Sequence, residues 1–320
     1  MKPFNVFPYG SKIDFMRVRW FSMGLAIALA VISLIGIATK GFNFALDFTG
    51  GTAVELHFDK PVNVEQVRGK LDDGGFGGAQ VQTFGSGNDL LVRLQTIGDS
   101  EGVNKVSQQT ATQIQKLLTT DGNKASVVSS EFVGPQVGKD LAQNGVWAVV
   151  FVLVGFLIYI SFRFEKKFAV AAVVGTLHDV LICLGWFAWT QHEFDLTVLA
   201  GVLSVMGFSI NDTIVVFDRV RENFRSMRGD PKNILNISIN QTLSRTVITS
   251  FVALLSALAL YIYGGDSMRG MSEAMIIGIV IGTLSSIFIS PPMLTLKHLR
   301  VTHEDMMPKT KYDAELARRP

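Results

Sequence analysis

Two aspartates lie in stretches of the sequence that are otherwise apolar enough to cross a membrane. Asp212 follows Asn211 in SINDTIVV, and Asp179 follows His178 in TLHDVLICLG. A charged side chain at the bilayer centre costs roughly 2.5–3.5 kcal/mol on insertion scales, and such residues usually line an interior or water-filled route. The chemistry that these carboxylates can support is the gain and loss of protons, with the histidine as a further titrating group.

A cation at matching depth is expected for Asp212. At about 1.5 Å per residue, Asp212 lies roughly 24 Å into its span and Asp179 roughly 16 Å into its own, in a core about 30 Å thick. Arg245 begins the next span at about the depth of Asp212. An Asp–Arg pair would keep the carboxylate ionised and would break when a proton binds. Thr249 could then relay through its hydroxyl, and Asn211 could orient the carboxylate or a water.

A structural explanation competes with this protonation switch. A buried Asp–Arg pair can serve only to fix helix register, and a residue near the membrane edge can extend its side chain to water. A neighbouring carbonyl can satisfy His178, and a His-Asp dipeptide is too few ligands for a metal site. We recognise no catalytic set, nucleotide-binding loop or cofactor motif. We therefore expect a protein that is not an enzyme, with no metal, no cofactor and no nucleic-acid partner.

Six apolar runs must position these residues. Of the 320 residues, 48% are hydrophobic and only 18% are charged, which is outside the usual range of soluble domains. A transmembrane helix needs about 17–25 apolar residues. The sequence therefore predicts an α-helical polytopic membrane protein with six transmembrane helices, the first of them retained and not cleaved as a signal peptide. The runs cover approximately 20–38, 143–162, 168–189, 196–217, 244–263 and 271–294.

The distribution of Lys and Arg predicts the orientation. These residues gather in the N-terminus, the loop RFEKK, the connector 219–232 and the tail, whereas the turns 191–195 and 264–270 contain only Arg269. By the positive-inside rule both termini are cytoplasmic and the segment after the first span lies outside. The basic connector is interpreted as a topology and lipid-headgroup feature; its residues are Arg219, Arg221, Arg225, Arg228 and Lys232.

The outside segment, residues 41–139, is predicted to be the one soluble domain. Alternating apolar residues and turn signals indicate the order β-α-β-β-α-β, which suggests an α+β ferredoxin-like domain with helices on one face of the sheet. The only cysteine, Cys183, lies within a span, so no disulfide braces this domain. The chain then divides into 1–40 (N-terminus and first helix), 41–139, 140–296 (five further helices) and 297–320 (cytoplasmic tail). The expected elements are 52–58, 62–75, 78–84, 88–94, 101–118 and 124–133, with a turn GSG at 85–87.

Small residues recur at helical spacing in the later spans. Gly278 and Gly282 form a GxxxG pair, and Gly175, Asp179 and Cys183 share one helix face. Small residues allow helices to approach closely. We therefore predict a compact bundle with its polar stripes facing inward.

The motif DFTGG follows the first span. Asp47, Gly50 and Gly51 lie where a helix leaves the membrane and a strand begins. A tight turn of permissive backbone is the economical explanation. The functional alternative is a hinge between the membrane part and the outside domain.

Four stretches resemble one known family: FALDFTGGT, VGPQVGKDL, FEKKFAVAAVVGTLHDVLICLG and SINDTIVVFDRVREN. The chain is similar over nearly its whole length to the SecD/SecF family of protein translocase subunits, and within it to the smaller, SecF-type members. The family is related to the resistance-nodulation-division exporters. The resemblance implies six helices with one exported, periplasmic domain between the first two.

The resemblance also implies a function. SecD and SecF assist the SecYEG channel and its SecA motor, using the proton-motive force to pull or release preproteins on the outer side of the bacterial inner membrane. The family's intramembrane Asp, Arg and Thr match Asp212, Arg245 and Thr249, and Asp179 matches a family-typical position. The related exporters use two six-helix halves, so the missing half is expected in a separate SecD chain. The basic connector could instead contact SecA or SecY.

Two other functions remain open. A proton-coupled small-molecule exporter of the same superfamily would use the same buried charges, although a single modest outside domain offers no second half to form a binding cleft. A purely structural assembly subunit would use the buried charges only for packing.

Overall fold

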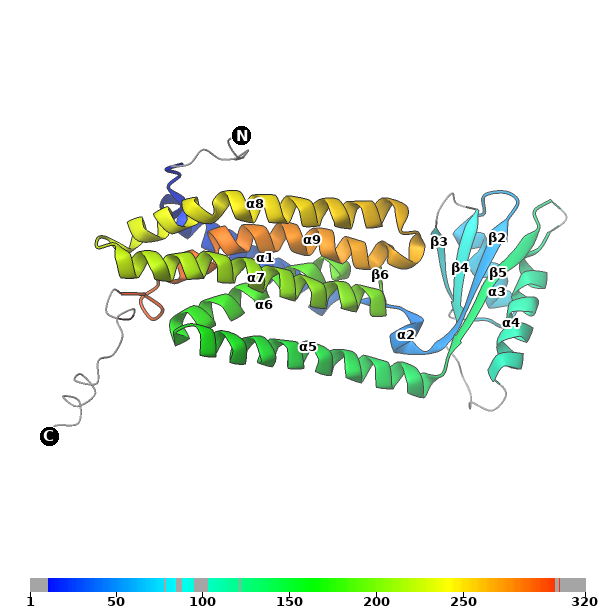
Figure 1. The fold of residues 1–320 in the computed structure, drawn as a ribbon. Helices are drawn as coiled ribbons and strands as arrows, with labels where there is room; N and C mark the ends of the chain where they lie inside the picture. The colour runs from blue at the N-terminus through cyan, green and yellow to red at the C-terminus, as the bar shows by residue number, and fades with distance from the viewer. Residues whose placement is uncertain are drawn as a thin grey trace. The chain divides into compact units, whose positions relative to one another are not determined.

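The computed structural model describes residues 11–77, 79–84, 88–94, 103–120, 122–302 and 305. The chain forms two compact units, one of residues Met1–Asn43 with Val149–Pro320 and one of Phe44–Ala148. We call them the helical unit and the α+β unit (Figure 1). The predicted turn 85–87 and most of the predicted tail 297–320 lie outside the described residues.

The α+β unit has the predicted order of elements. Its four strands form one antiparallel sheet in the order β3-β4-β2-β5, so the first strand of the motif lies between the third and the fourth. This order confirms the ferredoxin-like prediction. The elements are β2 (Gly51–Phe58), α3 (Val64–Asp73), β3 (Gln80–Phe84), β4 (Asp89–Leu94), α4 (Val103–Leu118) and β5 (Ala125–Val133).

Alternation along β2 builds the core of the α+β unit. Val54, Leu56 and Phe58 are buried, because every second side chain of a strand points to the same face. They pack with one apolar stripe from each helix, including Leu71 of α3 and Ile114 of α4. Helices therefore cover one face of this sheet.

The DFTGG motif forms a tight connection before β2. Asp47 lies in the short helix α2 (Leu46–Thr49), which ends at Gly50 with φ 66°. Gly51 follows with φ 127°, and a β-carbon there would overlap the backbone oxygen of Leu94. Both glycines have backbone angles that side chains rarely permit. A β-carbon on Gly138 of α5 would also come within 2.8 Å of the Gly50 nitrogen.

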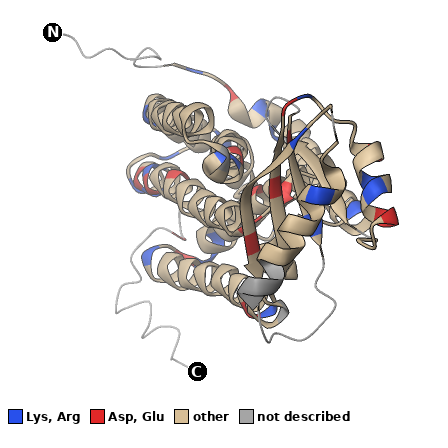
Figure 2. Cartoon of the chain, turned by 90° about the vertical axis from the view of Figure 1, so that its right-hand side faces the viewer, with Lys and Arg blue, Asp and Glu red and all other residues tan. Residues whose placement is uncertain are grey.

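Six helices within the described residues are long and apolar enough to cross a membrane, as predicted. Charged residues are few along their ribbons, which are mostly tan in Figure 2. Short elements accompany them: a 3-10 turn (Phe15–Val18), β1 (Asn43–Phe44), β6 (Glu193–Phe194) and α10 (Ser290–Met293). The long helices are α1 (Arg19–Lys40), α5 (Pro135–Arg163), α6 (Lys166–Thr190), α7 (Leu196–Ser226), α8 (Pro231–Tyr263) and α9 (Asp266–Phe288).

Burial separates these helices into two groups. In α6, α7 and α9, between 50 and 56% of the most apolar stretch is buried, against 11 to 17% in α1, α5 and α8. The first group therefore forms the centre of the helical unit. The predicted GxxxG pair lies here: Gly278 of α9 packs against Val205 of α7, and Gly282 packs against Ser209.

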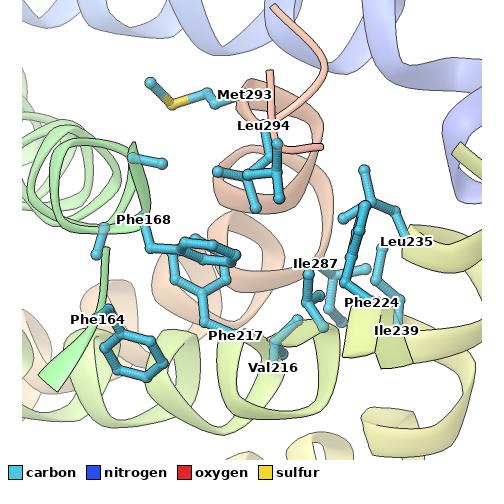
Figure 3. Close-up of a cluster of buried hydrophobic side chains, with 14 of the residues drawn as sticks. Phe164, Phe168, Val216, Phe217, Phe224, Leu235, Ile239, Ile287, Met293 and Leu294 are labelled. Carbon is cyan, nitrogen blue, oxygen red and sulfur yellow. The ribbon is translucent and has the colours of Figure 1, made fainter. Parts of the chain in front are cut away.

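Three helices differ clearly from their predicted spans. We expected the second span to begin near residue 143, but α5 begins at Pro135, within the predicted outside segment 41–139. We expected α7 to end near residue 217 and α8 to begin near 244, but α7 continues to Ser226 and α8 starts at Pro231. The extensions of α7 and α8 are apolar on one face: Phe224 of α7 lies beside Leu235 and Ile239 of α8, in the cluster that also contains Phe217 (Figure 3). Because that face is buried, most of the basic connector is helical and only residues 227–230 link the two helices.

Asp305 fastens the chain that follows α10 to the start of α6. Lys167 Nζ donates to its two carboxylate oxygens at 2.8 and 2.7 Å, and the Thr302 backbone N–H donates at 2.8 Å. Burial alone would raise the pKa of Asp305, but these hydrogen bonds and the lysine charge outweigh it and hold the pKa below its usual value.

This lowered pKa predicts a stability effect that depends on pH. A carboxyl with a depressed folded-state pKa stabilises the fold above its unfolded pKa, near 3.9, and loses this contribution as pH falls through the folded value. We expect Asp305→Asn to lower the melting temperature of the detergent-purified protein by a constant amount from about pH 7 to about pH 5, with the difference closing below about pH 4. A difference that does not change with pH would contradict this assignment.

Candidate functional site

Asp212 is a buried carboxyl group in the centre of the helical unit. It lies on α7, only 5% of the residue is exposed, and Ser286 Oγ of α9 donates a hydrogen bond to its Oδ2. Thr246 of α8 also interacts with the carboxylate through its hydroxyl, although this buried hydroxyl has no hydrogen bond of normal length. Three helices thus meet at this side chain.

The predicted partners of Asp212 are arranged differently from expectation. Arg245 is exposed on α8 and forms no ion pair with Asp212 in the described part of the chain, although its charge acts on the carboxylate. The hydroxyl of Thr249 donates to its own helix, to Arg245 O at 2.9 Å and Thr246 O at 3.0 Å. Asn211 is exposed. The structure therefore brings hydroxyls, and not the guanidinium, into contact with Asp212.

Asp179 is a second, fully buried carboxyl group. It lies on α6 with 0% exposure and accepts a hydrogen bond from Ser209 Oγ of α7 at 2.6 Å. His178 Nδ1 lies 3.0 Å from the other carboxylate oxygen, so these two adjacent residues are in contact. The second ring nitrogen of His178 is buried and has no hydrogen-bond partner in the part of the chain that the structure describes. The ring lines an apolar cavity of about 350 Å³ between α1, α6 and α9.

The two carboxyl sites are joined through α7 and α9. Ser209 and Asp212 are one turn apart on α7, so they share a face of that helix. Ser285 is next to Ser286 on α9, and its hydroxyl and that of Ser290 are buried without hydrogen-bond partners among the described residues. Both hydroxyls would approach a β-carbon placed at Gly175, one turn before Asp179. Such unpartnered hydroxyls are positions where bound water is expected.

The serines and Thr246 were not predicted as partners of the carboxylates. Ser286 is 74 residues from Asp212, and serines are common in membrane helices as packing residues. The usable signal was the helical spacing of Ser285, Ser286 and Ser290 beside the GxxxG pair. Among the described residues, no group of three or more His, Cys, Asp or Glu side chains could hold a metal ion.

This arrangement can bind and release protons but shows no nucleophile with an activating base among the described residues. Each carboxyl group has hydroxyl neighbours that can donate to its ionised form and can turn to accept from its protonated form. These hydroxyls reduce the ordinary cost of burying a charge at each carboxyl group.

We predict that the Ser209 hydroxyl stabilises the bundle. In Ser209→Ala, one oxygen of the buried Asp179 carboxyl group loses its donor, and we expect unfolding to become easier by about 1–3 kcal/mol. Ser204→Ala is the matched control, because Ser204 is exposed on the same helix and donates only to Ala200 O. Its effect should stay within about 0.5 kcal/mol. Thermal unfolding of both variants in detergent tests this, and equal stability of the two would contradict it.

The fold and site define a class of protein: a multi-pass membrane protein with two buried carboxyl groups on its apolar helices and one α+β domain after its first span. Two family models match the chain. The model for "Protein export membrane protein SecD/SecF, C-terminal" matches residues 113–300, and the "SecD/SecF GG Motif" matches residues 35–62. The second match contains Asp47, Gly50 and Gly51.

Individual relatives agree with the family models. The chain is 45% identical to the protein translocase subunit SecF of Pseudomonas aeruginosa over 94% of this chain and 96% of that protein. It is 41% identical to the SecF of Escherichia coli O157:H7 over 98% and 95%. The crystal structure of SecDF, a translocon-associated membrane protein from Thermus thermophilus, superimposes with a TM-score of 0.80 at 36% identity. That match covers 90% of this chain and 39% of the SecDF chain. The chain therefore belongs to the SecD/SecF family.

Proposed function

We propose that this chain is an accessory subunit of the Sec protein translocase. Together with SecD, it uses the proton-motive force to promote preprotein translocation and release on the outer side of the bacterial inner membrane. The observation that carries the proposal is a carboxyl group, Asp212, buried at the meeting point of α7, α8 and α9 with only hydroxyl partners among the described residues. Membership of a family of export proteins supports protein export as the process that proton binding would drive.

The proposed mechanism begins with proton binding to Asp212. Protonation removes the negative charge on which Arg245 acts and turns the carboxyl group into a donor. The hydroxyls of Ser286 and Thr246 must then rearrange, which shifts α9 and α8 relative to α7. Packed interfaces have discrete arrangements, so a small local change becomes a movement of whole helices. Asp179, with His178, would be the second titrating point on the route.

Movement of the helices would reach the α+β unit along the chain through α1 and α5. The two glycines after α2, Gly50 and Gly51, are the proposed hinge on the α1 side. Their positive φ angles support a connection of special backbone geometry, and only glycine tolerates such angles at low cost.

SecD is proposed to cover the exposed face of α8. Arg245 and Thr249 lie on this face, and only 17% of the apolar stretch of α8 is buried within the chain. A second six-helix half against it would enclose the guanidinium and bring it into the proton route. SecYEG with SecA would be the further partners, and translocating preproteins the cargo.

The proposed topology places both termini and the α7–α8 link in the cytoplasm. The α+β unit, the α6–α7 turn and the α8–α9 turn then lie on the periplasmic side. The positions of Lys and Arg in the sequence support this orientation, and residues 297–320 would form a cytoplasmic tail.

A deletion strain separates the proposed function from the alternatives. We expect loss of the chain to slow export of periplasmic and outer-membrane proteins, with no change in sensitivity to dyes, detergents or antibiotics. The full-length gene should restore export, and SecD should co-purify with the chain from mild detergent. Drug hypersensitivity with normal export would favour a small-molecule exporter. Normal export after neutralising Asp212 and Arg245 together would favour a purely structural subunit.

A further inference from the structure

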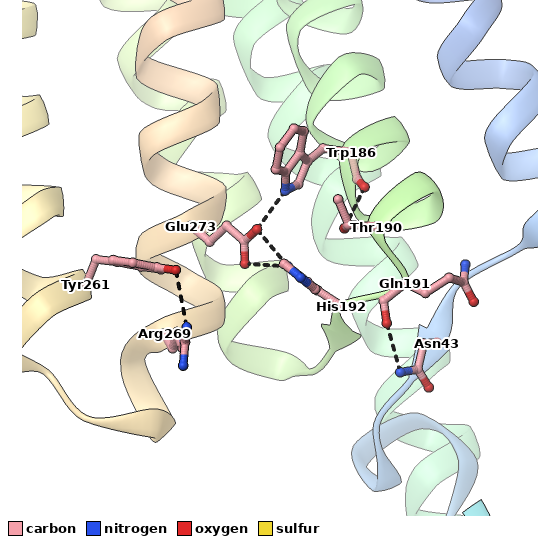
Figure 4. A network of polar contacts seen from close by, with 8 residues as sticks. All are labelled: Asn43, Trp186, Thr190, Gln191, His192, Tyr261, Arg269 and Glu273. Atoms are coloured by element: carbon pink, nitrogen blue, oxygen red, sulfur yellow. Dashed lines mark hydrogen bonds and ion pairs between the residues drawn. The ribbon is translucent and has the colours of Figure 1, made fainter. Parts of the chain in front are cut away.

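A second polar cluster lies at the end of the helical unit that carries the α6–α7 and α8–α9 turns. Glu273 of α9 accepts a hydrogen bond from Trp186 Nε1 of α6 at 2.7 Å (Figure 4). Its two carboxylate oxygens lie 2.8 and 3.0 Å from His192 Nδ1, in the turn after α6. This cluster is separate from Asp179 and Asp212, and no motif in the sequence pointed to it.

The histidine and the carboxylate of this cluster differ in their exposure. The side chain of His192 is 54% exposed, whereas that of Glu273 is only 14% exposed. Histidine is the side chain that ordinarily changes charge between about pH 5 and pH 8. Water can therefore reach the imidazole, while the carboxylate that faces it belongs to the helix interior.

Trp186 of the cluster and Asp179 lie on the same helix, α6. Trp186 is seven residues after Asp179, which is about 10 Å along the helix. Cys183 lies between them on the same face, fully buried, and its thiol donates to Ala274 O of α9 at 3.6 Å. Two small residues, Cys183 and Ala274, therefore form the contact between α6 and α9 at this level.

We propose that His192 and Glu273 form the proton-accepting site at the outer mouth of the bundle, from which protons pass along α6 to Asp179. This inference rests on the proposed function and its topology. A proton from outside water binds His192 Nε2, and the Nδ1 proton passes to the Glu273 carboxylate. The imidazole is left neutral and the carboxyl group protonated. Glu273 then releases that proton to water that enters beside Cys183, with Asp179 as the acceptor.

Other charged and titratable groups surround the site. Arg269 stacks on Tyr261 of α8 with 5.4 Å between guanidinium and ring centroid, and Lys40 of α1 lies 4.7 Å from the Trp189 ring. The remaining groups are Cys183 on α6, Glu193 beside His192, and Asp195, which caps the start of α7.

The test is proton influx at a series of external pH values. The full chain is reconstituted with its SecD partner in liposomes that trap a pH-sensitive dye, and a membrane potential, negative inside, drives the flux. We expect Glu273→Gln and His192→Gln to shift the pH profile by about one unit toward acid, a tenfold higher proton concentration. Flux at acid pH should reach the wild-type level, because at a high external proton concentration water can bring protons toward Asp179 without the His192–Glu273 relay. The matched control His298→Gln, at an exposed histidine after α10, should keep the wild-type profile.

The variants separate this proposal from the function on which it rests. In Glu273→Gln the new amide oxygen can still accept from Trp186, and Glu273→Asp keeps a titrating group and should move the profile back toward wild type. If Asp212→Asn abolishes influx while both outer variants keep the wild-type profile, the outer site is wrong and the proposed function stands. Loss of influx at every pH in the outer variants would also overturn the outer site. Wild-type influx in Asp212→Asn would overturn the proposed function itself.

Discussion

Asp212→Asn is expected to reduce protein export to the level of a strain that lacks the chain. Asparagine has nearly the same shape and can still accept the hydrogen bond from Ser286, so the bundle should assemble. It cannot gain or lose a proton, so position 212 would no longer couple the gradient to helix movement. The measurement is release of an exported preprotein with and without a proton gradient, in cells or vesicles that contain equal amounts of the variant and wild-type chains.

Asp218→Asn is the matched control for this experiment. Asp218 is on the same helix, but its side chain is 44% exposed and pairs with Arg163 at 2.8 Å. A surface ion pair contributes about 0–1 kcal/mol, so we expect export close to wild type. If Asp212→Asn preserved release that depends on the gradient, the proposed trigger would be wrong. Co-purification of SecD with the variant would show that assembly is intact.

Gly278→Val is expected to prevent the central helices from packing. A β-carbon on Gly278 would lie 2.7 Å from the β-carbon of Val205, and closer still to its methyl groups. The two helices cannot easily move apart at this point, because they are also in close contact on either side of it. Gly282 packs on Ser209, and Gly201 of α7 packs on Ala274. Overpacking of this kind costs about 1–3 kcal/mol. Separation of α7 from α9 would also remove Ser286 from Asp212, so export should fall together with the amount of folded protein.

Gly207→Val provides the comparison for Gly278→Val. Gly207 is also within a membrane helix, but a β-carbon there would meet nothing within 4 Å. We expect this variant to accumulate and to unfold at nearly the wild-type temperature. Membrane protein levels and thermal aggregation in detergent measure both effects. Equal levels for the two variants would show that close contact at Gly278 does not hold α7 against α9.

Much of the fold was predictable because its signals are local. The alternating pattern of β2 and the apolar periodicity of α4 follow from the neighbours of each residue in the chain, and their order indicated the ferredoxin-like sheet. The ends of α7 and α8 were not predictable from apolar length. Past the predicted boundaries these helices are apolar on one face only, and their packing partners, such as Phe224 with Leu235, come from different segments.

The candidate site was only partly predictable, because depth in a span is easier to estimate than rotation about the helix axis. Successive residues of a helix differ by about 100° in direction, since there are 3.6 residues per turn. A depth match between Asp212 and Arg245 therefore left open which neighbour faces the carboxylate. In the structure Thr246 is buried and Arg245 is exposed. His178 and Asp179 were recognised together because they are adjacent in sequence, but Ser209 comes from another helix.

The exposed position of Arg245 has a consequence for how cells would manage this subunit. An exposed cationic side chain on an apolar helix is unfavourable wherever it meets acyl chains, and the proposed SecD interface would relieve that penalty. A copy without SecD would then leave this charge exposed, whereas an assembled copy would cover it. An exposed charge of this kind is a defect that membrane proteases can detect. Balanced synthesis of the two subunits would follow from the exposure of this one guanidinium.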